Sequence, residues 1–173
     1  MGCIVNFIGF QIGWAACVIS VAQDQIIFAI FVTLSIVAFH LKRHNYPAEY
    51  YIILIATVTG FVWETLLLAS GWLSYGQSDV AIKFAPIWLV AMWALFATTI
   101  NSSLAWLKER WLLASLMGGV FGPLAFMAGE KLGAVQLNSS LALLALAIGW
   151  SIILPLLLWL ADILKYRFES LEV

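Results

Sequence analysis

The sequence predicts an all-α fold, an integral membrane bundle of six transmembrane helices with both termini in the cytoplasm. Three observations support this prediction: the composition, the series of apolar segments, and the distribution of basic residues between them. Of the 173 residues, 64% are hydrophobic and 10% are charged, and the mean hydropathy is +1.03. Soluble domains are about 45–50% apolar and about 25% charged, so this composition is typical of a membrane protein. The net charge of −1 gives no indication of a nucleic-acid partner.

Apolar segments long enough to cross a bilayer follow one another along the whole chain. A spanning helix needs about 20 mostly apolar residues. The segments that meet this requirement are, in order, about 4–22, 25–42, 50–70, 84–107, 111–130 and 137–161. The first is the weakest because it contains Asn6 and Gln11, and only Gln23-Asp24-Gln25 separates it from the second. Little chain remains outside these segments, so residues 1–173 are predicted to form a single transmembrane domain.

Basic residues in the short connections predict the orientation. Six of the eight are expected on one side of the membrane, namely Lys42, Arg43, Lys108, Arg110, Lys165 and Arg167. The other side would have Lys83 and Lys131. Cytoplasmic loops of membrane proteins carry the excess of Lys and Arg. The termini are therefore expected inside a bacterial cell, and the protein in its inner membrane as a multi-pass protein.

The third segment contains an acidic residue, Glu64, within the stretch GFVWETLLL. It follows Tyr50 by fourteen residues, or about 21 Å of helix, in a hydrocarbon core about 30 Å thick. An ionisable group at such a depth costs at least about 2–3 kcal/mol and normally faces the protein interior. Glu64 is therefore the first candidate for a functional residue.

Small residues recur on two of the predicted helices. Thr57, Gly60 and Glu64 share one face of the third segment at helical spacing. A matching face of the fifth segment contains Ser115, Gly118, Gly122, Ala125 and Gly129. Small residues at every fourth position let two helices approach closely. Such faces could join helices within the bundle or two copies in a homodimer.

The fifth segment also contains the sequence GGVFGP at residues 118–123. Pro123 removes a backbone donor and frees the carbonyl group of Gly119. Together with Gly122, this predicts a kink or a short unwound segment near the level of Glu64. We expect Glu64 and this break to face a common polar pocket. The alternative is a protonated Glu64 that bonds to the freed carbonyl and only joins two helices.

Other polar residues have simpler explanations. The hydroxyl groups of the segment Thr98-Thr99-Ile100-Asn101-Ser102-Ser103 are expected to bond back to the preceding turn. Glu130 could line the mouth of a pocket that leads to Glu64, or it could belong to a solvated helix end. His40 and His44 have a spacing that can bind a metal, but no third ligand is visible nearby, so interfacial histidines are favoured. The sequence indicates no metal and no cofactor.

Three stretches resemble a family of small bacterial inner-membrane proteins classed as a domain of unknown function. They are GFVWETLLLASGWLSY (60–75), APIWLVAMWALFATTINSSLAWL (85–107) and GGVFGPLAFMAGEKLGAV (118–135). The resemblance implies a multi-span protein of the inner membrane and no particular activity. Members of this family are often encoded near enzymes that modify fatty acids, such as cyclopropane-type methyltransferases, and this implies a connection with lipid.

Three hypotheses about function follow. In the first, the protein is an accessory component of lipid or fatty-acid modification, and a pocket near Glu64, lined by Trp63, Trp88 and Trp93, binds an acyl chain or a small lipophilic molecule. In the second, it is a small proton-coupled transporter that uses Glu64. In the third, it is a non-catalytic membrane scaffold. The first predicts a lipid-sized cavity open to the bilayer, the second an aqueous path, and the third tight packing. Whether the protein is an enzyme stays open, and no catalytic residue is assigned.

Overall fold

The computed structural model describes residues 2–75 and 84–170, and six α-helices make up most of this part of the chain. They are α1 (Cys3–Ala22), α2 (Ile26–Arg43), α3 (Pro47–Ala69), α4 (Ile87–Ile100), α5 (Trp111–Lys131) and α6 (Ser140–Glu169). The other elements are a 3₁₀ turn, η1 (Ala105–Leu107), and two short strands, β1 (Leu73–Tyr75) and β2 (Val135–Leu137). Five of the helices, all except α4, are long and apolar enough to span a membrane. The predicted all-helical membrane bundle is thus confirmed at this level.

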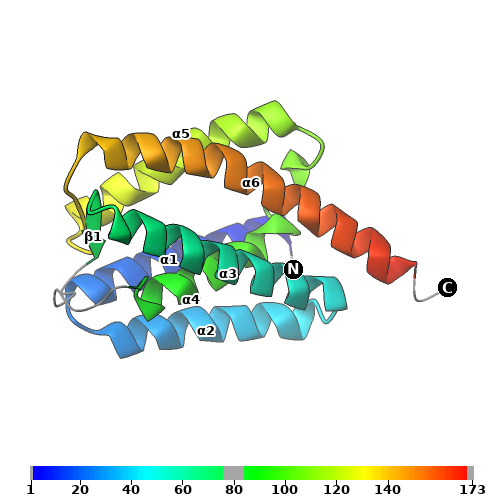
Figure 1. Cartoon of the computed structure of the whole chain (residues 1–173). Coiled ribbons are helices and arrows are strands. Elements are labelled where there is room, and N and C mark those ends of the chain that lie inside the picture. Colours follow the sequence, from blue (N-terminus) through cyan, green and yellow to red (C-terminus); the bar gives the residue numbers. More distant parts are fainter. Residues whose placement is uncertain (1, 76–83, 171–173) are drawn as a thin grey trace.

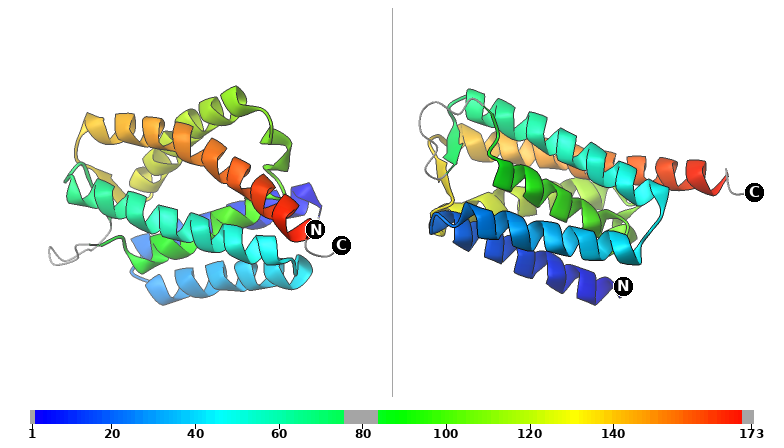
Figure 2. Two further views of the ribbon diagram at one scale, coloured as in Figure 1. Left: turned by 45° about the vertical axis from the view of Figure 1, so that its right-hand side comes forward. Right: turned by 90° about the horizontal axis from the view of Figure 1, so that it is seen from below.

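The helices run side by side, and α4 lies at the centre of the bundle (Figure 1). It packs against α1, α2, α3 and α6, whereas α5 packs mainly against α6. The beginning of α1 and the end of α6 lie at the same end of the bundle (Figure 2). The strands lie at the opposite end.

The fourth segment differs from its prediction. A single helix over 84–107 was expected, but α4 covers only Ile87–Ile100, beginning directly after Pro86. Near its end, the hydroxyl groups of Thr98 and Thr99 donate to the carbonyl groups three residues earlier, as expected, at 2.7 and 2.6 Å. A helix of this length covers about 21 Å, less than the thickness of the hydrocarbon core. The bundle can contain it because its neighbours separate most of its surface from lipid.

The sixth helix is longer than predicted and begins later. The segment 137–161 was expected, but α6 runs from Ser140, where the hydroxyl of Ser139 accepts from the Leu141 amide, to Glu169. Its C-terminal half is bound to the turn after α4. There the ammonium group of Lys108 donates to Asp162 at 2.6 Å and to Asn101 at 2.8 Å. Lys83, which the charge count placed on the outer side, lies outside the described residues.

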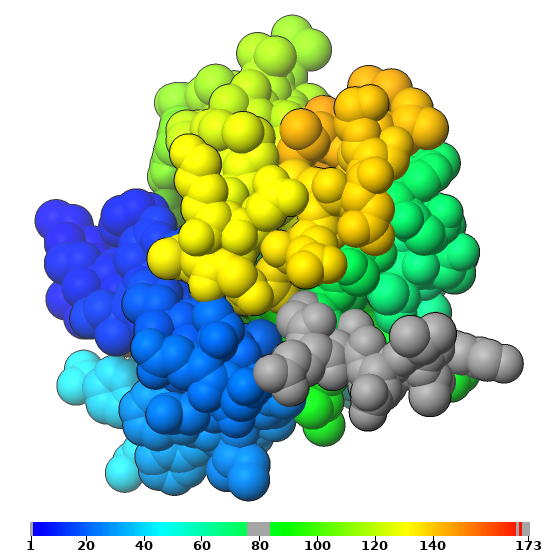
Figure 3. Space-filling model, turned by 90° about the vertical axis from the view of Figure 1, so that its left-hand side faces the viewer, coloured from blue at the N-terminus to red at the C-terminus, as the bar shows by residue number. Residues whose placement is uncertain are grey.

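A two-stranded antiparallel ribbon joins the segment after α3 to the segment after α5, at the end of the bundle opposite the termini, and the sequence did not predict it. Leu73 pairs with Leu137, and Tyr75 pairs with Val135. The two turns that lead into the strands contain Gly71 and Gly133, at φ values of 73° and 85°, which glycine adopts without strain. Figure 3 shows that the segment containing β2 covers the middle of this end, between the α1–α2 turn and the end of α3.

The weakest predicted segment forms a regular helix, α1, and both the nitrogen and the oxygen of its buried Asn6 amide have hydrogen-bond partners. The amide of Asn6 donates to the carbonyl of Thr98 at 3.1 Å. Its oxygen accepts from the backbone and the hydroxyl of Ser103, at 3.3 and 2.8 Å. Gln11 on the same helix is exposed. Asn6 therefore fastens the first helix to the end of α4.

We expect Asn6→Ala to lower the free energy of unfolding by about 1 kcal/mol, because interhelical hydrogen bonds within membranes have roughly this strength. The measurement is reversible unfolding in mixed micelles, followed by tryptophan fluorescence. Gln11→Ala on the same helix is the control and should change stability little. Equal effects of the two substitutions would contradict the role assigned to Asn6.

Candidate functional site: a cavity beside Glu64

The carboxyl group of Glu64 lies inside the bundle, and its residue is only 1% exposed. Two neutral donors reach it from different elements. The indole N–H of Trp93 on α4 donates to Oε1 at 3.0 Å, and the phenol of Tyr75 on β1 donates to Oε2. Burial of a carboxyl group is tolerated when its oxygens are hydrogen-bonded. Glu64 thus faces the bundle interior and connects α3, α4 and the ribbon.

Tyr75 was missed as a site residue because it lies beyond the end of the third apolar segment. The ribbon turns the chain back over the end of α3, so a residue eleven positions after Glu64 reaches its side chain. Tyr75 is 2% exposed and packs edge to face against Trp88, with ring centroids 6.1 Å apart. The only available signal was the presence of a hydroxyl donor within a short loop next to a buried acid.

Glycine residues of the predicted small-residue faces make room for indole rings. A Cβ atom on Gly60 would come within 2.1 Å of the Trp93 ring, and one on Gly122 within 2.4 Å of the Trp150 ring. Gly149 similarly lies against Trp63, at 2.2 Å. The small-residue face of α3 therefore packs against an aromatic side chain of α4. The small-residue face of α5, by contrast, brings two helix backbones close together, because Gly118 lies against the backbone of α6.

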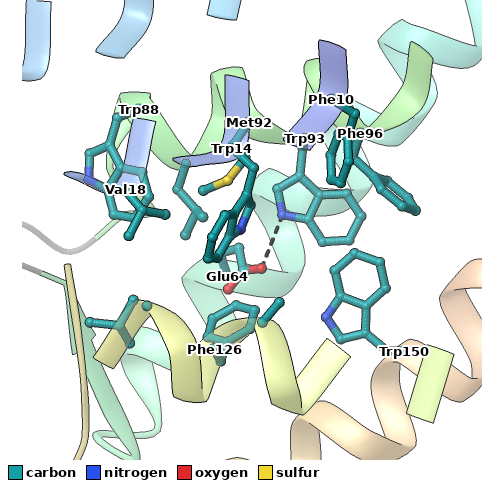
Figure 4. A pocket seen from close by; sticks show the side chains of 14 residues that line it. Phe10, Trp14, Val18, Glu64, Trp88, Met92, Trp93, Phe96, Phe126 and Trp150 are labelled. Atoms are coloured by element: carbon teal, nitrogen blue, oxygen red, sulfur yellow. Dashed lines mark hydrogen bonds between the residues drawn. The ribbon is translucent and has the colours of Figure 1, made fainter. Parts of the chain in front are cut away.

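An apolar cavity of about 90 Å³ lies beside Glu64, between the layer of α1 and α4 and the layer of α5 and α6 (Figure 4). Trp14, Trp88 and Trp93 lie on one side of it, with Phe126 and Trp150 on the other. Within the described part of the chain, the lining comprises Phe10, Trp14, Val18, Glu64, Trp88, Leu89, Met92, Trp93, Phe96, Ala125, Phe126, Gly129, Val135 and Trp150. Among the described residues that line the cavity, Glu64 is the only one with an ionisable side chain. The space is smaller than the lipid-sized cavity that the first hypothesis predicted, and ligand sites usually enclose about 300–1,000 Å³.

Three of the candidate residues line this cavity, namely Glu64, Trp88 and Trp93. The remaining candidates lie outside its lining: Thr57, Trp63, Gly119, Gly122, Pro123 and Glu130. The hydroxyl of Thr57 donates to the Ile53 carbonyl in its own helix, and the carboxylate of Glu130 accepts from the backbone N–H of Leu137, the last residue of β2. The contribution of α1, through Phe10, Trp14 and Val18, was missed although these residues repeat at every fourth position.

The expected unwound segment near Pro123 is not formed. Helix α5 runs without interruption from Trp111 to Lys131. A proline removes one hydrogen bond from a helix, and packing can maintain the remaining ones. Here Gly119 lies against Ser151 of α6, where an added Cβ would be 2.4 Å from the Ser151 hydroxyl. Helix α5 thus stays continuous through Pro123 and packs closely against α6. It contributes Ala125, Phe126 and Gly129 to the cavity lining.

The histidine pair lies at the end of α2, away from this cavity. The rings of His40 and His44 stack at 4.7 Å, and Nε2 of His40 is 3.3 Å from the Glu49 carboxylate. Partial burial, followed by the neighbouring His40, lowers the pKa of His44 below its usual value. No group of three residues with metal-binding side chains occurs in the described part of the chain.

The apolar helices and their buried aromatic core define the class: this is a multi-pass helical membrane protein. The chain belongs to a protein family of unknown function, DUF2878, whose model matches residues 3–156. This confirms the resemblance to an uncharacterised family, over nearly the whole chain. No curated protein and no solved structure matches the chain.

We expect Gly60→Ala to destabilise the protein by about 1–3 kcal/mol, as overpacked cores do, because the new methyl group would displace the Trp93 ring from Glu64. Unfolding in mixed micelles measures the effect. Gly129→Ala is the matched control, since its Cβ would meet only Val135, at an ordinary 3.5 Å. A Gly60→Ala protein as stable as the control would contradict this account of the site.

Proposed function

We propose that this protein is an accessory component of lipid or fatty-acid modification in the bacterial inner membrane, and that the cavity beside Glu64 holds part of a lipophilic molecule. The observation that carries the proposal is an apolar space inside a membrane bundle, bordered by a single carboxyl group. Apolar walls with a few placed polar groups are typical of binding sites for small molecules. The volume of about 90 Å³ fits a slender part of a molecule and not a bulky one.

A scaffold is the second candidate, and one observation favours it. Both oxygens of Glu64 are already bonded, to Tyr75 and Trp93, so the carboxyl group can serve purely to connect elements. Proton-coupled transport has less support, because a proton relay needs several ionisable groups at membrane depth and the cavity lining contains one. A homodimer is also part of our proposal, but it would use a surface other than Gly60 and Gly122, which adjoin indole rings within the chain.

The lipid proposal is tested by the lipid profile of cells. A deletion strain should show a shift in at least one lipid class that the wild-type gene restores. We expect Glu64→Gln at matched expression to fail to restore it if the carboxyl group acts on a ligand in the cavity, because the variant removes that acid. Under the scaffold function the variant should restore the profile, since a neutral amide can still hydrogen-bond to Trp93 and Tyr75. Glu109→Gln, an exposed position in the loop before α5, is the control and should restore the profile.

If the deletion leaves every lipid class unchanged, the lipid proposal is wrong. If the deletion has an effect that Glu64→Gln restores fully, the scaffold function replaces the binding function at this residue.

We also propose that both termini lie in the cytoplasm, as the basic residues indicate. A green fluorescent protein fused after Val173 should therefore fluoresce. Alkaline phosphatase at the same position should be inactive, because it needs disulfides that form outside the cytoplasm. The opposite pair of results would reverse the orientation.

A further inference from the structure

The indole of Trp150 presents a donor that the described residues leave unused. Its Nε1 atom is buried and has no hydrogen-bond partner among them. In Figure 4 this nitrogen turns toward the space between Glu64 and Phe126. The parallel indole of Trp93, with its ring centroid 4.8 Å away, donates to Glu64 instead. Two stacked indoles thus border the same cavity, and only one of them is satisfied.

The position of the Trp150 ring is fixed on several sides. It stacks on Trp93 and meets Phe96 edge to face at 5.1 Å. Gly122 of α5 leaves no side chain beside it, and a Cβ there would overlap the ring. The N–H group therefore cannot turn away to find another acceptor. A buried donor without an acceptor is unfavourable, so an oxygen atom delivered by a ligand would remove that penalty.

On one side of the cavity, the lining helices α1 and α5 do not pack against each other over an extended interface. Helix α1 packs against α2 and α4, and α5 packs against α6. Both nevertheless contribute to the lining, through Trp14 on α1 and Phe126 on α5 among others. At the outer end the cavity is bordered by Val135 of the ribbon. The seam between α1 and α5 is therefore the route by which a molecule dissolved in the bilayer would enter.

The depth of the donor restricts the ligand. Trp150 is ten residues into α6, or about 15 Å from its outer end, which is about half of the hydrocarbon core. The ester and headgroup oxygens of a phospholipid lie at the membrane surface and would not reach this level from the same leaflet. An oxygen atom at this depth belongs to the middle or far part of an acyl chain.

We propose that the cavity holds the middle part of one acyl chain, which enters between α1 and α5 and carries an oxygen substituent partway along its length, and that this oxygen accepts from Nε1 of Trp150. The inference rests on the proposed lipid function and names the chemical class of its ligand. A hydroxyl or keto group would serve equally as the acceptor. The narrow cavity fits an unbranched chain.

The test uses the purified full-length protein and a stearic acid derivative with a photoreactive diazirine midway along the chain. Labelled residues are located by mass spectrometry, and we expect label on the cavity lining of α1 and α5. Two competitors are compared: stearic acid, and the same acid with a mid-chain hydroxyl group. The hydroxylated acid should compete at about tenfold lower concentration, the ratio expected for one hydrogen bond to a donor otherwise left unpaired.

Trp150→Phe removes the N–H group and keeps an aromatic ring, so labelling should persist while the preference for the hydroxylated acid disappears. Trp159→Phe is the matched control, because Trp159 lies on the same helix at an exposed position, and this variant should keep the preference. If Trp150→Phe does not fold, the wild-type competition still decides the ligand class.

Two outcomes would overturn this inference. Equal competition by the two acids in the wild type would exclude the oxygenated chain as the ligand, while leaving the proposed lipid function intact. Labelling confined to residues outside the cavity would exclude the binding mode. The lipid profile of the deletion strain tests the proposed function separately, so the two failures are distinguishable.

Discussion

The burial of one carboxyl group constrains much of the half of this bundle that contains the ribbon. An acid within an apolar interior needs hydrogen-bond donors, and Glu64 obtains them from Trp93 and Tyr75. The first donor requires Gly60, because any side chain there would overlap the indole ring. The second requires the ribbon, because only a chain that turns back over α3 can return a residue that follows this helix to the level of Glu64. The need to hydrogen-bond this one carboxyl group thus accounts for the presence of Gly60, Trp93 and Tyr75 at their positions, and for the two strands that hold Tyr75 in place.

The same residues form the cavity, so its shape follows from the way the carboxyl group is satisfied. Trp93 binds Glu64 with its edge and stacks on Trp150 with its face. Large rigid rings leave gaps that flexible aliphatic side chains would fill, and proteins tolerate few such gaps in their cores. The aromatic side chains around Glu64 do not fill the interior completely and leave a space of about 90 Å³. That space is the feature that most favours binding over simple support.

Features that follow from local sequence were predicted well, and features that depend on distant partners were not. Hydropathy alone located all six helices. The depth of Glu64 marked it as a candidate site residue, but the sequence left open whether it faces the bundle or a partner subunit. The end of α4 at Ile100 was missed, since the polar residues after it looked compatible with a helix and are instead bound to Asn6 and Lys108. The ribbon and Tyr75 were missed because strand pairing between segments 62 residues apart leaves no periodic pattern in either. The glycines were recognised as sites of close approach, but their partners, the indole rings, could not be deduced from spacing.

The long separation between hydrogen-bonded partners has a consequence for how the protein is made. Asn6 is bound to Ser103, which follows it by 97 residues, so the first helix enters the membrane long before its polar side chain can be paired. Glu64 acquires its Tyr75 donor in the native position only when β2 exists to hold β1, after α5 has been synthesised. Early helices must therefore stay in the bilayer, or beside the insertion machinery, with unpaired polar groups. The bundle can therefore form its native contacts only after its C-terminal half has been synthesised. Chains truncated before that point would lack the contacts that stabilise their first helices.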